Sequence, residues 1–334
     1  MAEQGLAALV LAGRTVAEYR DGRGLDPTLV PRPHLHPVRT LGGTAVSAAC
    51  PDDHPWHLGF SVAVPDVGGA NLWGGPTYLR GQGYTWRTDH GRIEHLGFSR
   101  RAEDGFDETL RWRAATGEVL LAEDRAVRAR LVGGGWELVL VTTLTNTTAR
   151  PLRLASPAAN GRDGAGYGGL FWRLPPGAAP RVRTPTAEGE QATHGSVAPW
   201  LAWSDPGTAG ATRDAGGGTS GGTSGGTSGG GSSGGSSGGS SGGGGGSSGG
   251  GGGSSGGGGA APFSLVFAPA DAATRADPWF VRVSDYPGVG SQLAAPAPLV
   301  LAPGVALTRG LRTLVADGLF DDAAAARWAA TEIS

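Results

Sequence analysis

The sequence predicts an all-β protein, a large antiparallel β-sandwich that ends in one short C-terminal helix. Strand-like runs bounded by glycine, proline, aspartate or asparagine recur through most of the 334 residues. Many short strands at regular spacing are typical of sandwiches and barrels. The longest runs are rich in β-branched and apolar residues, which suits pleated, half-buried strands.

The predicted strands follow one another with turn residues between them. They cover residues 8–19, 43–49, 59–64, 92–99, 106–114, 119–131, 136–146, 152–156, 170–174, 200–204 and 263–267. Three glycines at 133–135 predict a tight hairpin between residues 125–132 and 136–146. Near the C-terminus, the alanine-rich residues 321–331 begin with aspartates, which favour the start of a helix.

A low-complexity tract interrupts this pattern. Residues 216–259 contain only glycine, serine and threonine, so they have no apolar surface to bury and are expected to form a disordered loop. Strand-like residues 200–204 and 263–267 lie on either side of the tract. We therefore interpret it as an insertion within a single domain spanning residues 1–334, because the entropy of closing a loop grows only logarithmically with its length.

The charged residues and the single cysteine exclude several classes of function. All 27 cationic residues are arginines, scattered among 29 acidic residues, so the basic run of a nucleic-acid-binding protein is missing and no lysine can form a Schiff base. One cysteine, Cys50, excludes an internal disulfide and a multi-cysteine metal site.

The apolar runs indicate neither a membrane protein nor a secreted one. No run approaches the roughly 20 apolar residues of a membrane span, and the first residues lack the cationic start and apolar core of a signal peptide. We expect a soluble cytoplasmic protein with no nucleic-acid or membrane partner.

Two sequence patterns that resemble catalytic motifs are incomplete. Gly166, Gly168 and Gly169 precede residues 170–174, which have a strand pattern, whereas a dinucleotide-binding loop leads into a helix. We therefore expect no nucleotide cofactor. The residues around Ser196 contain only a fragment of a Gly-x-Ser-x-Gly elbow, which argues against a serine hydrolase.

Four of the seven histidines lie within residues 32–59, at positions 34, 36, 54 and 57. Prolines at 33, 37, 51 and 55 keep these segments in extended or turn conformations, and rigid loops with titratable side chains commonly carry function. The first hypothesis is acid–base catalysis, in which a histidine and a carboxylate exchange protons with a sugar. Its catalytic residues are His54, His57 and Glu123.

Glu123 has a second interpretation. In an extended strand it shares one face with Leu121, Arg125 and Val127, so a Glu123–Arg125 contact is expected. A satisfied ion pair on the sheet surface would give Glu123 a structural role only.

A metal site is the other hypothesis for the histidines. His36, His54 and His57, with His90 and His95 as outer members, offer imidazoles for a divalent metal ion, and Asp53 or Glu123 offers a carboxylate. The three-residue spacing of His54 and His57 requires a turn to bring both rings onto one ion.

Ten tryptophans are the third clue. Five lie in glycine- and proline-rich motifs, at positions 56, 73, 86, 172 and 279, where their rings suit stacking against sugars; the alternative is that they fill the core. Arginines supply planar, bidentate hydrogen bonds to carboxylates or diols. The predicted substrate-binding residues are His36, Arg39, Trp73, His90, Arg173, Trp279 and Arg282.

Several motifs in the same order resemble the PmoA-like family of uncharacterised bacterial proteins, whose members often carry the label methane oxygenase. The motifs are RPHLHPVRT at 32–40, DHPWHLG at 53–59, NLWGG at 71–75, GYGGLFWR at 166–173 and PWFVR at 278–282. Many members have two adjacent histidines where this sequence has Trp56 and His57. A membrane-embedded methane oxygenase does not fit a chain without a spanning segment.

The resemblance implies a β-sandwich of the galactose mutarotase-like supersandwich type, used by aldose epimerases and some lyases, and a role in sugar catabolism. We expect an enzyme acting on a sugar or sugar derivative, an epimerase, lyase or hydrolase. A non-catalytic carbohydrate-binding protein and a metal-dependent enzyme are the alternatives.

Overall fold

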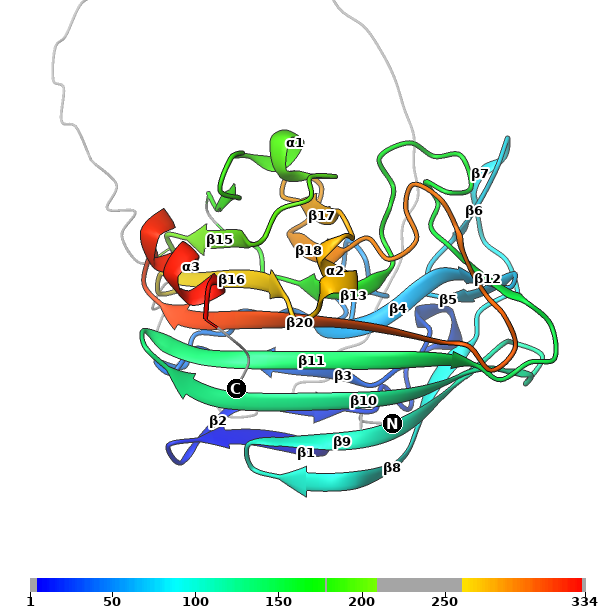
Figure 1. Ribbon diagram of the computed structural model, residues 1–334, viewed down its shortest axis with the longest axis horizontal. Helices are drawn as coiled ribbons and strands as arrows, with labels where there is room; N and C mark the ends of the chain where they lie inside the picture. Colours follow the sequence, from blue (N-terminus) through cyan, green and yellow to red (C-terminus); the bar gives the residue numbers. More distant parts are fainter. Residues whose placement is uncertain (1–4, 178, 209–259, 332–334) are drawn as a thin grey trace, which may run out of the picture.

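Two large antiparallel sheets lie face to face and form a β-sandwich (Figure 1). The structure is a computed structural model that describes residues 5–177, 179–208 and 260–331. The predicted all-β class and the short C-terminal helix are confirmed. The glycine-rich tract 216–259 lies outside the described residues.

One sheet has ten strands in the described part of the chain, and it carries the histidine loops. Seven of them are neighbours in the order β1 (Gly5–Leu11), β2 (Arg14–Arg20), β3 (His34–Val38), β4 (Phe60–Val67), β13 (Gly169–Arg173), β18 (Gly288–Ser291) and β17 (Trp279–Arg282). Three more join through β4 or through one another: β5 (Ala70–Leu72), β12 (Leu152–Ala155) and β19 (Leu299–Leu301).

The second sheet contains the longest strands. Among the described residues its eight strands follow the order β14 (Arg181–Arg183), β15 (Leu201–Asp205), β16 (Phe263–Pro269), β20 (Ala306–Asp317), β11 (Gly135–Asn146), β10 (Val119–Val132), β9 (Gly105–Arg113) and β8 (Arg92–Ala102). The predicted hairpin at the glycine triplet joins β10 to β11, with Val132 opposite Gly135. β15 pairs with β16, so the strands that flank the tract are neighbours in one sheet.

The remaining elements are short. A separate hairpin, β6 (Thr77–Leu79) and β7 (Gly83–Thr85), rises from one end of the sandwich (Figure 1). The helical elements are the 3₁₀ turn at Pro27–Leu29, α1 (Glu190–Thr193), α2 (Ala272–Arg275) and α3 (Asp322–Ala329). In the part of the chain that the structure describes, no helix has the length and apolarity needed to cross a membrane.

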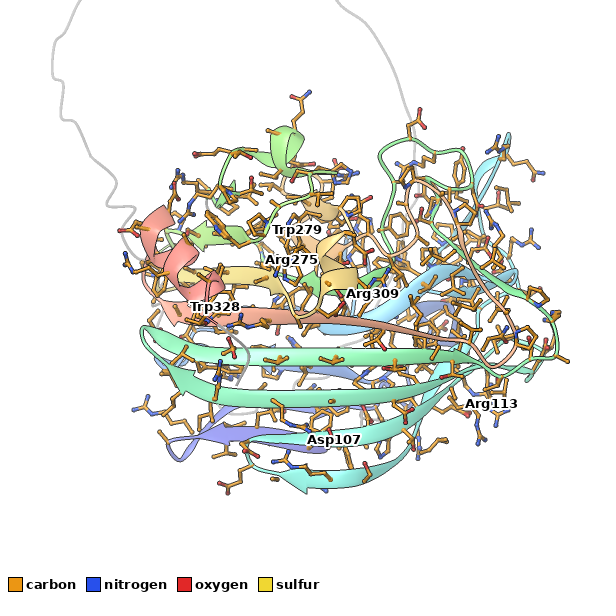
Figure 2. All side chains as sticks on the ribbon, viewed as in Figure 1. Asp107, Arg113, Arg275, Trp279, Arg309 and Trp328 are labelled. Atoms are coloured by element: carbon orange, nitrogen blue, oxygen red, sulfur yellow. The ribbon has the colours of Figure 1, made fainter. Side chains whose placement is uncertain are left out.

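The main core lies between the two sheets, where side chains fill the space (Figure 2). Aromatic rings meet across it: Trp172 of β13 lies edge-on to Phe267 of β16, with ring centroids 5.6 Å apart, and Tyr19 of β2 lies 4.5 Å from Phe106 of β9. Alternation along each strand places every second side chain in this core.

Each sheet also buries apolar groups on its outer face. On the eight-stranded sheet, α3 covers Val266 and Leu314 with Ala325 and Trp328, the latter labelled in Figure 2. On the ten-stranded sheet, Ala63 of β4, Phe171 of β13 and Phe280 of β17 pack with Trp73, and no helix covers them among the described residues. This uncovered outer face becomes the floor of the candidate site.

Two predicted strands differ in the structure. The run at residues 8–19 is a hairpin, because Ala12 and Gly13 have φ values of 49° and 73° and reverse the chain. Residues 43–49 form only isolated bridges to Arg39 and Leu58. There the Ser47 hydroxyl accepts the backbone N–H of Val38 at 2.8 Å, which replaces a ladder hydrogen bond.

Candidate functional site

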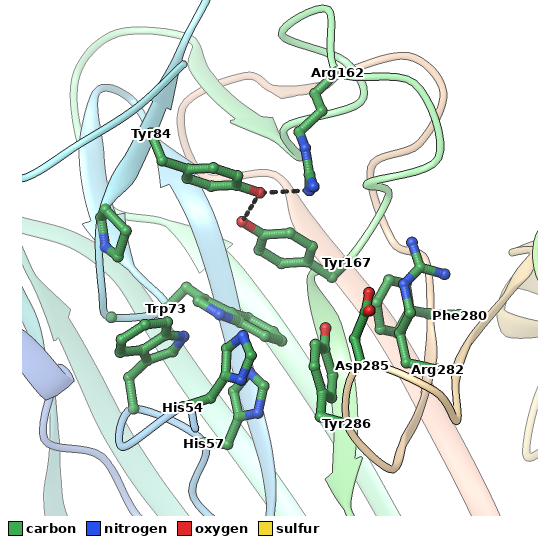
Figure 3. A pocket seen from close by; sticks show the side chains of 13 residues that line it. His54, His57, Trp73, Tyr84, Arg162, Tyr167, Phe280, Arg282, Asp285 and Tyr286 are labelled. Carbon is green, nitrogen blue, oxygen red and sulfur yellow. Dashed lines mark hydrogen bonds between the residues drawn. The ribbon is translucent and has the colours of Figure 1, made fainter. Parts of the chain in front are cut away.

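A cavity of about 420 Å³ opens on the outer face of the ten-stranded sheet (Figure 3). The loop between β3 and β4, the loop after β5, the β6–β7 hairpin, the loop before β13, and β17 with the loop after it all contribute to its walls. Its lining residues are His54, Trp56, His57, Trp73, Gly74, Pro76, Tyr84, Arg162, Tyr167, Phe280, Arg282, Asp285 and Tyr286.

Aromatic rings form most of the cavity wall. Trp73 is the centre of this group, with ring centroids 4.7 Å from Tyr167 and 5.0 Å from Phe171. Phe280 lies edge-on to Tyr167 at 6.0 Å, and Tyr286 closes the side nearest the histidines. A wall of this kind suits the apolar faces of sugar rings, which leave hydroxyl groups for the polar residues between them.

A buried arginine holds the two tryptophan-bearing loops together. Arg32 is fully buried, and its guanidinium donates to the carbonyl oxygens of Trp56 at 2.9 Å and Trp73 at 3.0 Å. It also donates to the Ser61 hydroxyl at 3.2 Å. The positions of both tryptophans therefore depend on one side chain beneath the floor.

The NLWGG segment is folded by its own asparagine. The Asn71 side-chain oxygen accepts the backbone N–H groups of Trp73 at 2.9 Å and Gly74 at 2.8 Å, and its amide donates to Gly75 O at 3.0 Å. His90 reaches the same Gly75 carbonyl through Nε2 at 2.7 Å. This turn presents the Trp73 ring to the cavity.

Gly75 is required where the Trp56 ring crosses the turn. Its φ is +68°, and a Cβ there would lie 2.5 Å from the indole of Trp56. Gly81 has a similar φ of +79° but open space around it. A substitution to alanine there therefore measures the cost of the backbone conformation without the cost of a steric clash.

We therefore expect Gly75→Ala to destabilise the fold by about 2 kcal/mol more than Gly81→Ala, since both lose the left-handed conformation but only the first displaces Trp56. Urea unfolding followed by circular dichroism gives both values, and tryptophan emission reports the displacement. Equal costs for the two variants, with unchanged emission, would contradict the packing described here.

His54 and His57 come together at the base of the cavity. The turn of residues 54–57 closes with a backbone hydrogen bond from His57 N to His54 O at 2.9 Å, and the two imidazoles stack with centroids 4.7 Å apart and planes 7° from parallel. The ring of Tyr286 lies 4.4 Å from His54 and 4.8 Å from His57. The sequence left open which histidines converge, and the structure brings these two together.

The two rings differ in environment. His57 is 1% exposed, and its Nδ1 has no hydrogen-bond partner in the described part of the chain. Burial, and then the charges of His54, Arg173 and Arg32, hold the pKa of His57 well below its usual value. His57 is therefore uncharged and buried beneath the stack, whereas His54 has 29% of its side chain exposed and is the more accessible of the two lining rings.

A carboxylate orients His54. Asp53 Oδ2 lies 3.2 Å from Nδ1 of His54, and the Arg173 Nη2 donates to the two oxygens of Asp53 at 2.9 and 2.8 Å. Partial burial opposes ionisation of Asp53, but hydrogen bonds from His54 and Arg173 lower its pKa below the usual value. An ionised Asp53 fixes the proton of neutral His54 on Nδ1 and leaves Nε2 as a proton acceptor.

The buried histidines make stability depend on pH. Burial lowers the pKa of His34 from 6.5 to about 3 and that of His57 well below 6.5. Between pH 6.5 and 5 the unfolded chain therefore binds protons that the folded chain cannot hold. The free energy of unfolding should fall as pH decreases, by about 0.7 kcal/mol per pH unit for each ring near pH 6.5 and by about 1.4 kcal/mol per pH unit near pH 5.

Urea unfolding at pH 6.5, 6.0, 5.5 and 5.0 measures this slope, and His57→Phe should reduce it by the share of one ring. An unchanged slope in His57→Phe would mean that His57 is protonated in the folded protein.

Sequence comparison assigns the chain to a family. The family model matches residues 7–220 and 244–330. The chain belongs to DUF6807, a family of unknown function. No curated protein and no solved structure matches the chain.

Four residues predicted for the site of this DUF6807 chain do line the cavity: His54, His57, Trp73 and Arg282. Arg173 lies one layer behind it, with its guanidinium carbon 5.3 Å from the ring centroid of Tyr286. The other predicted residues lie elsewhere in the fold.

Glu123 is not a partner of the histidines. It lies on the inner face of β10, where Arg125 Nε donates to it at 2.7 Å, Trp112 Nε1 at 2.7 Å and the Thr142 hydroxyl at 2.8 Å. The predicted catalytic role is wrong, because the core separates this face from the outer face that carries His54. The ion-pair interpretation was right about the contact with Arg125, but the pair is buried between the sheets.

The predicted three-histidine metal site is also wrong. His36 bonds to the Ser47 hydroxyl through Nδ1 at 3.0 Å and is absent from the cavity lining. His95 bonds to Glu108 at 2.6 Å. Within residues 5–177, 179–208 and 260–331, no group of three or more histidine, cysteine, aspartate or glutamate side chains is arranged to hold a metal ion.

Four predicted substrate-binding residues have other positions. Trp279 begins β17, points into the core and donates from Nε1 to Ala198 O at 3.0 Å; Trp172 of β13 likewise faces the core. His90 supports the turn at Gly75, as described above. Arg39 and His36 lie outside the cavity, on the segment that pairs with residues 45–47.

Sequence reasoning missed six lining residues with aromatic or charged side chains: Tyr84, Arg162, Tyr167, Phe280, Asp285 and Tyr286. Tyr167 and Phe280 belong to the GYGGLFWR and PWFVR motifs, so their membership of these motifs was the available signal, and Phe280 is the direct neighbour of Trp279. Strand alternation decides which of two adjacent aromatics faces the cavity, and the sequence does not say which face is outside.

Proposed function

We propose that this chain is a carbohydrate-active enzyme, an epimerase, lyase or hydrolase, that acts on a sugar or sugar derivative with His54 as its acid–base group. The observation that carries the proposal is the Asp53–His54 pair at the base of a cavity with aromatic walls. The resemblance to the PmoA-like family supports the same substrate class.

The chemistry of the site is proton transfer. His54 Nε2 is positioned to take a proton from a bound sugar, while Asp53 stabilises the imidazolium that forms and Arg173 holds Asp53 in place. Asp53 thus fills the carboxylate role that the sequence analysis gave to Glu123. Neutral His57 packs against the reacting ring and excludes water beneath it.

Tyr286 supplies a hydrogen-bond donor beside the base, with its ring centroid 4.4 Å from that of His54. Burial raises the pKa of Tyr286 above its usual value, so its hydroxyl remains protonated. Its hydroxyl points into the cavity in Figure 3. A protonated phenol there stabilises an oxyanion that develops when His54 removes a proton.

The test is proton NMR of the protein with a panel of aldoses, uronic acids and glycosides in D₂O. Loss of a carbon-bound proton signal indicates an epimerase or lyase, faster equilibration of anomers indicates a mutarotase-type epimerase, and release of a free sugar indicates a hydrolase. A panel with none of these changes overturns the enzymatic proposal, and tryptophan quenching in the same panel would then favour a non-catalytic carbohydrate-binding protein.

A further inference from the structure

Arg162 occupies the rim of the cavity without an ion-pair partner. Its Nη1 donates to the Tyr84 hydroxyl at 2.7 Å, and its guanidinium carbon lies 4.8 Å from the centroid of that ring. No carboxylate pairs with it in the described part of the chain. Figure 3 shows the guanidinium beside the Tyr84 hydroxyl and above Tyr167, and the two tyrosine hydroxyls lie 3.0 Å apart. Most of its donors therefore remain for another group.

The loop that carries Arg162 is fixed on both sides. Arg80 Nε donates to Asn160 O at 3.2 Å, and Arg282 Nη2 donates to Gly164 O at 2.7 Å. His194 Nε2 lies 2.9 Å from the same Gly164 carbonyl. These contacts hold Arg162 at the rim and explain why Arg282, although it lines the cavity, has its terminal nitrogens occupied by backbone carbonyls.

Arg32, beneath the floor of the cavity, is a second arginine whose hydrogen-bond partners among the described residues include no carboxylate. Every hydrogen bond of the Arg32 guanidinium goes to a neutral group, four carbonyl oxygens and the Ser61 hydroxyl. Burial lowers the pKa of Arg32 to about 9, which leaves it protonated at neutral pH. Charges buried in a low-dielectric interior act over longer distances than exposed ones, so the base of the cavity is positive.

We propose that the occupant of the cavity is an anionic sugar derivative, a sugar carboxylate, whose carboxylate is bound by Arg162. This inference rests on the proposed function and names its substrate class. A guanidinium matches the two oxygens of a carboxylate with paired hydrogen bonds, and the sugar ring then lies between Arg162 and the aromatic floor.

The one carboxylate of the lining, Asp285, sets the orientation. It lies beside Tyr286 and Arg282, on the other side of the cavity from Tyr84 (Figure 3). A substrate carboxylate turned toward Asp285 meets a like charge, whereas one turned toward Arg162 meets an unpaired cation. The arrangement favours one orientation of the sugar and directs its hydroxyl groups toward His54.

Binding of matched sugars tests the proposal. Tryptophan quenching and calorimetry measure Kd for D-glucose, D-galactose and D-mannose, for the corresponding uronic acids and for the 6-phosphates, at 20 and 500 mM NaCl. We expect at least one uronic acid to bind about tenfold or more tightly than its neutral partner, with the difference reduced at high salt.

Arg162→Gln should remove this preference and Arg162→Lys should retain part of it. The matched control is Arg150→Gln, which removes an exposed arginine paired with Glu118 outside the cavity and should leave the preference unchanged. A phosphate that binds more tightly than the uronic acid would overturn the assignment to a carboxylate.

A panel in which no uronic acid exceeds its neutral partner, including one in which nothing binds, also overturns the proposal. Neutral sugars that are bound and converted equally well by wild type and Arg162→Gln would overturn the anionic substrate while leaving the proposed function standing. A panel without binding or conversion contradicts both.

Discussion

Replacing His54 with glutamine is expected to lower turnover by about 10²–10⁴-fold while Kd for the bound sugar changes by less than about threefold. Glutamine keeps the polarity and approximate size of the ring, but its amide is not basic and cannot accept the proton that Nε2 of His54 accepts. The measurement is the initial rate in the NMR assay, with Kd from tryptophan quenching, for wild type and variant at the same pH.

The matched control is His36→Gln. His36 comes from the same pair of histidine-rich segments, but it bonds to Ser47 and does not line the cavity, so its turnover should stay within about twofold of wild type. Asp53→Asn adds a second measurement: its turnover should fall and its pH profile should shift, because an amide cannot stabilise the imidazolium. Full activity in His54→Gln would remove His54 from the mechanism.

Replacing Arg125 with leucine is expected to destabilise the protein by about 3–5 kcal/mol. Arg125 is fully buried between the sheets, bonds to Glu123 at 2.7 Å and to the Tyr19 hydroxyl at 2.7 Å, and lies 3.9 Å from Glu108. Leucine leaves two buried carboxylates without their cation. Urea unfolding monitored by circular dichroism gives the change in free energy.

Two further variants make this result interpretable. Arg150→Leu breaks an exposed pair with Glu118 and should cost at most about 1 kcal/mol. Arg125→Lys keeps the positive charge but loses the guanidinium that bonds to both Glu123 and Tyr19. Its cost in free energy of unfolding should therefore lie between those of Arg125→Leu and Arg150→Leu. It should also stay folded if Arg125→Leu does not fold. Equal costs for Arg125→Leu and Arg150→Leu would show that the buried network contributes nothing beyond a surface pair.

The central strands of the fold were predictable because their alternation is regular. Residues 105–146 form three long strands whose inward positions are mostly apolar or aromatic, with Glu108, Glu123 and Arg125 as the charged exceptions. The predicted bounds of these strands differ from the observed ones by one residue or less. β20 was missed although it lies between β16 and β11. Its Arg312 is buried and pairs with Glu137 at 2.6 Å on the neighbouring β11. Together with Arg309 and Gly310, this buried charge interrupts the apolar alternation from which a central strand is predicted.

Four of the thirteen lining residues were among the predicted site residues. His54, His57 and Trp73 stand in short motifs where proline and glycine fix the backbone, so a functional role could be inferred without the topology. Arg162 lies in the loop before β13 and Tyr84 lies in β7, and the two meet only because the β6–β7 hairpin stands at that end of the sandwich. Their convergence is a property of sheet order, which the sequence does not reveal.

Because β15 and β16 are paired neighbours, the two ends of the chain segment that joins them are held close together. The length of that segment can therefore change without moving either strand. The neck is closed by hydrogen bonds between Thr208 and Ala260, at 2.9 and 2.8 Å, and the family match passes over residues 221–243. Doubling such a connection costs only about 0.6 kcal/mol. A change in the length of this connection therefore has little effect on the stability of the sheet, and the same position suits the insertion of a reporter domain.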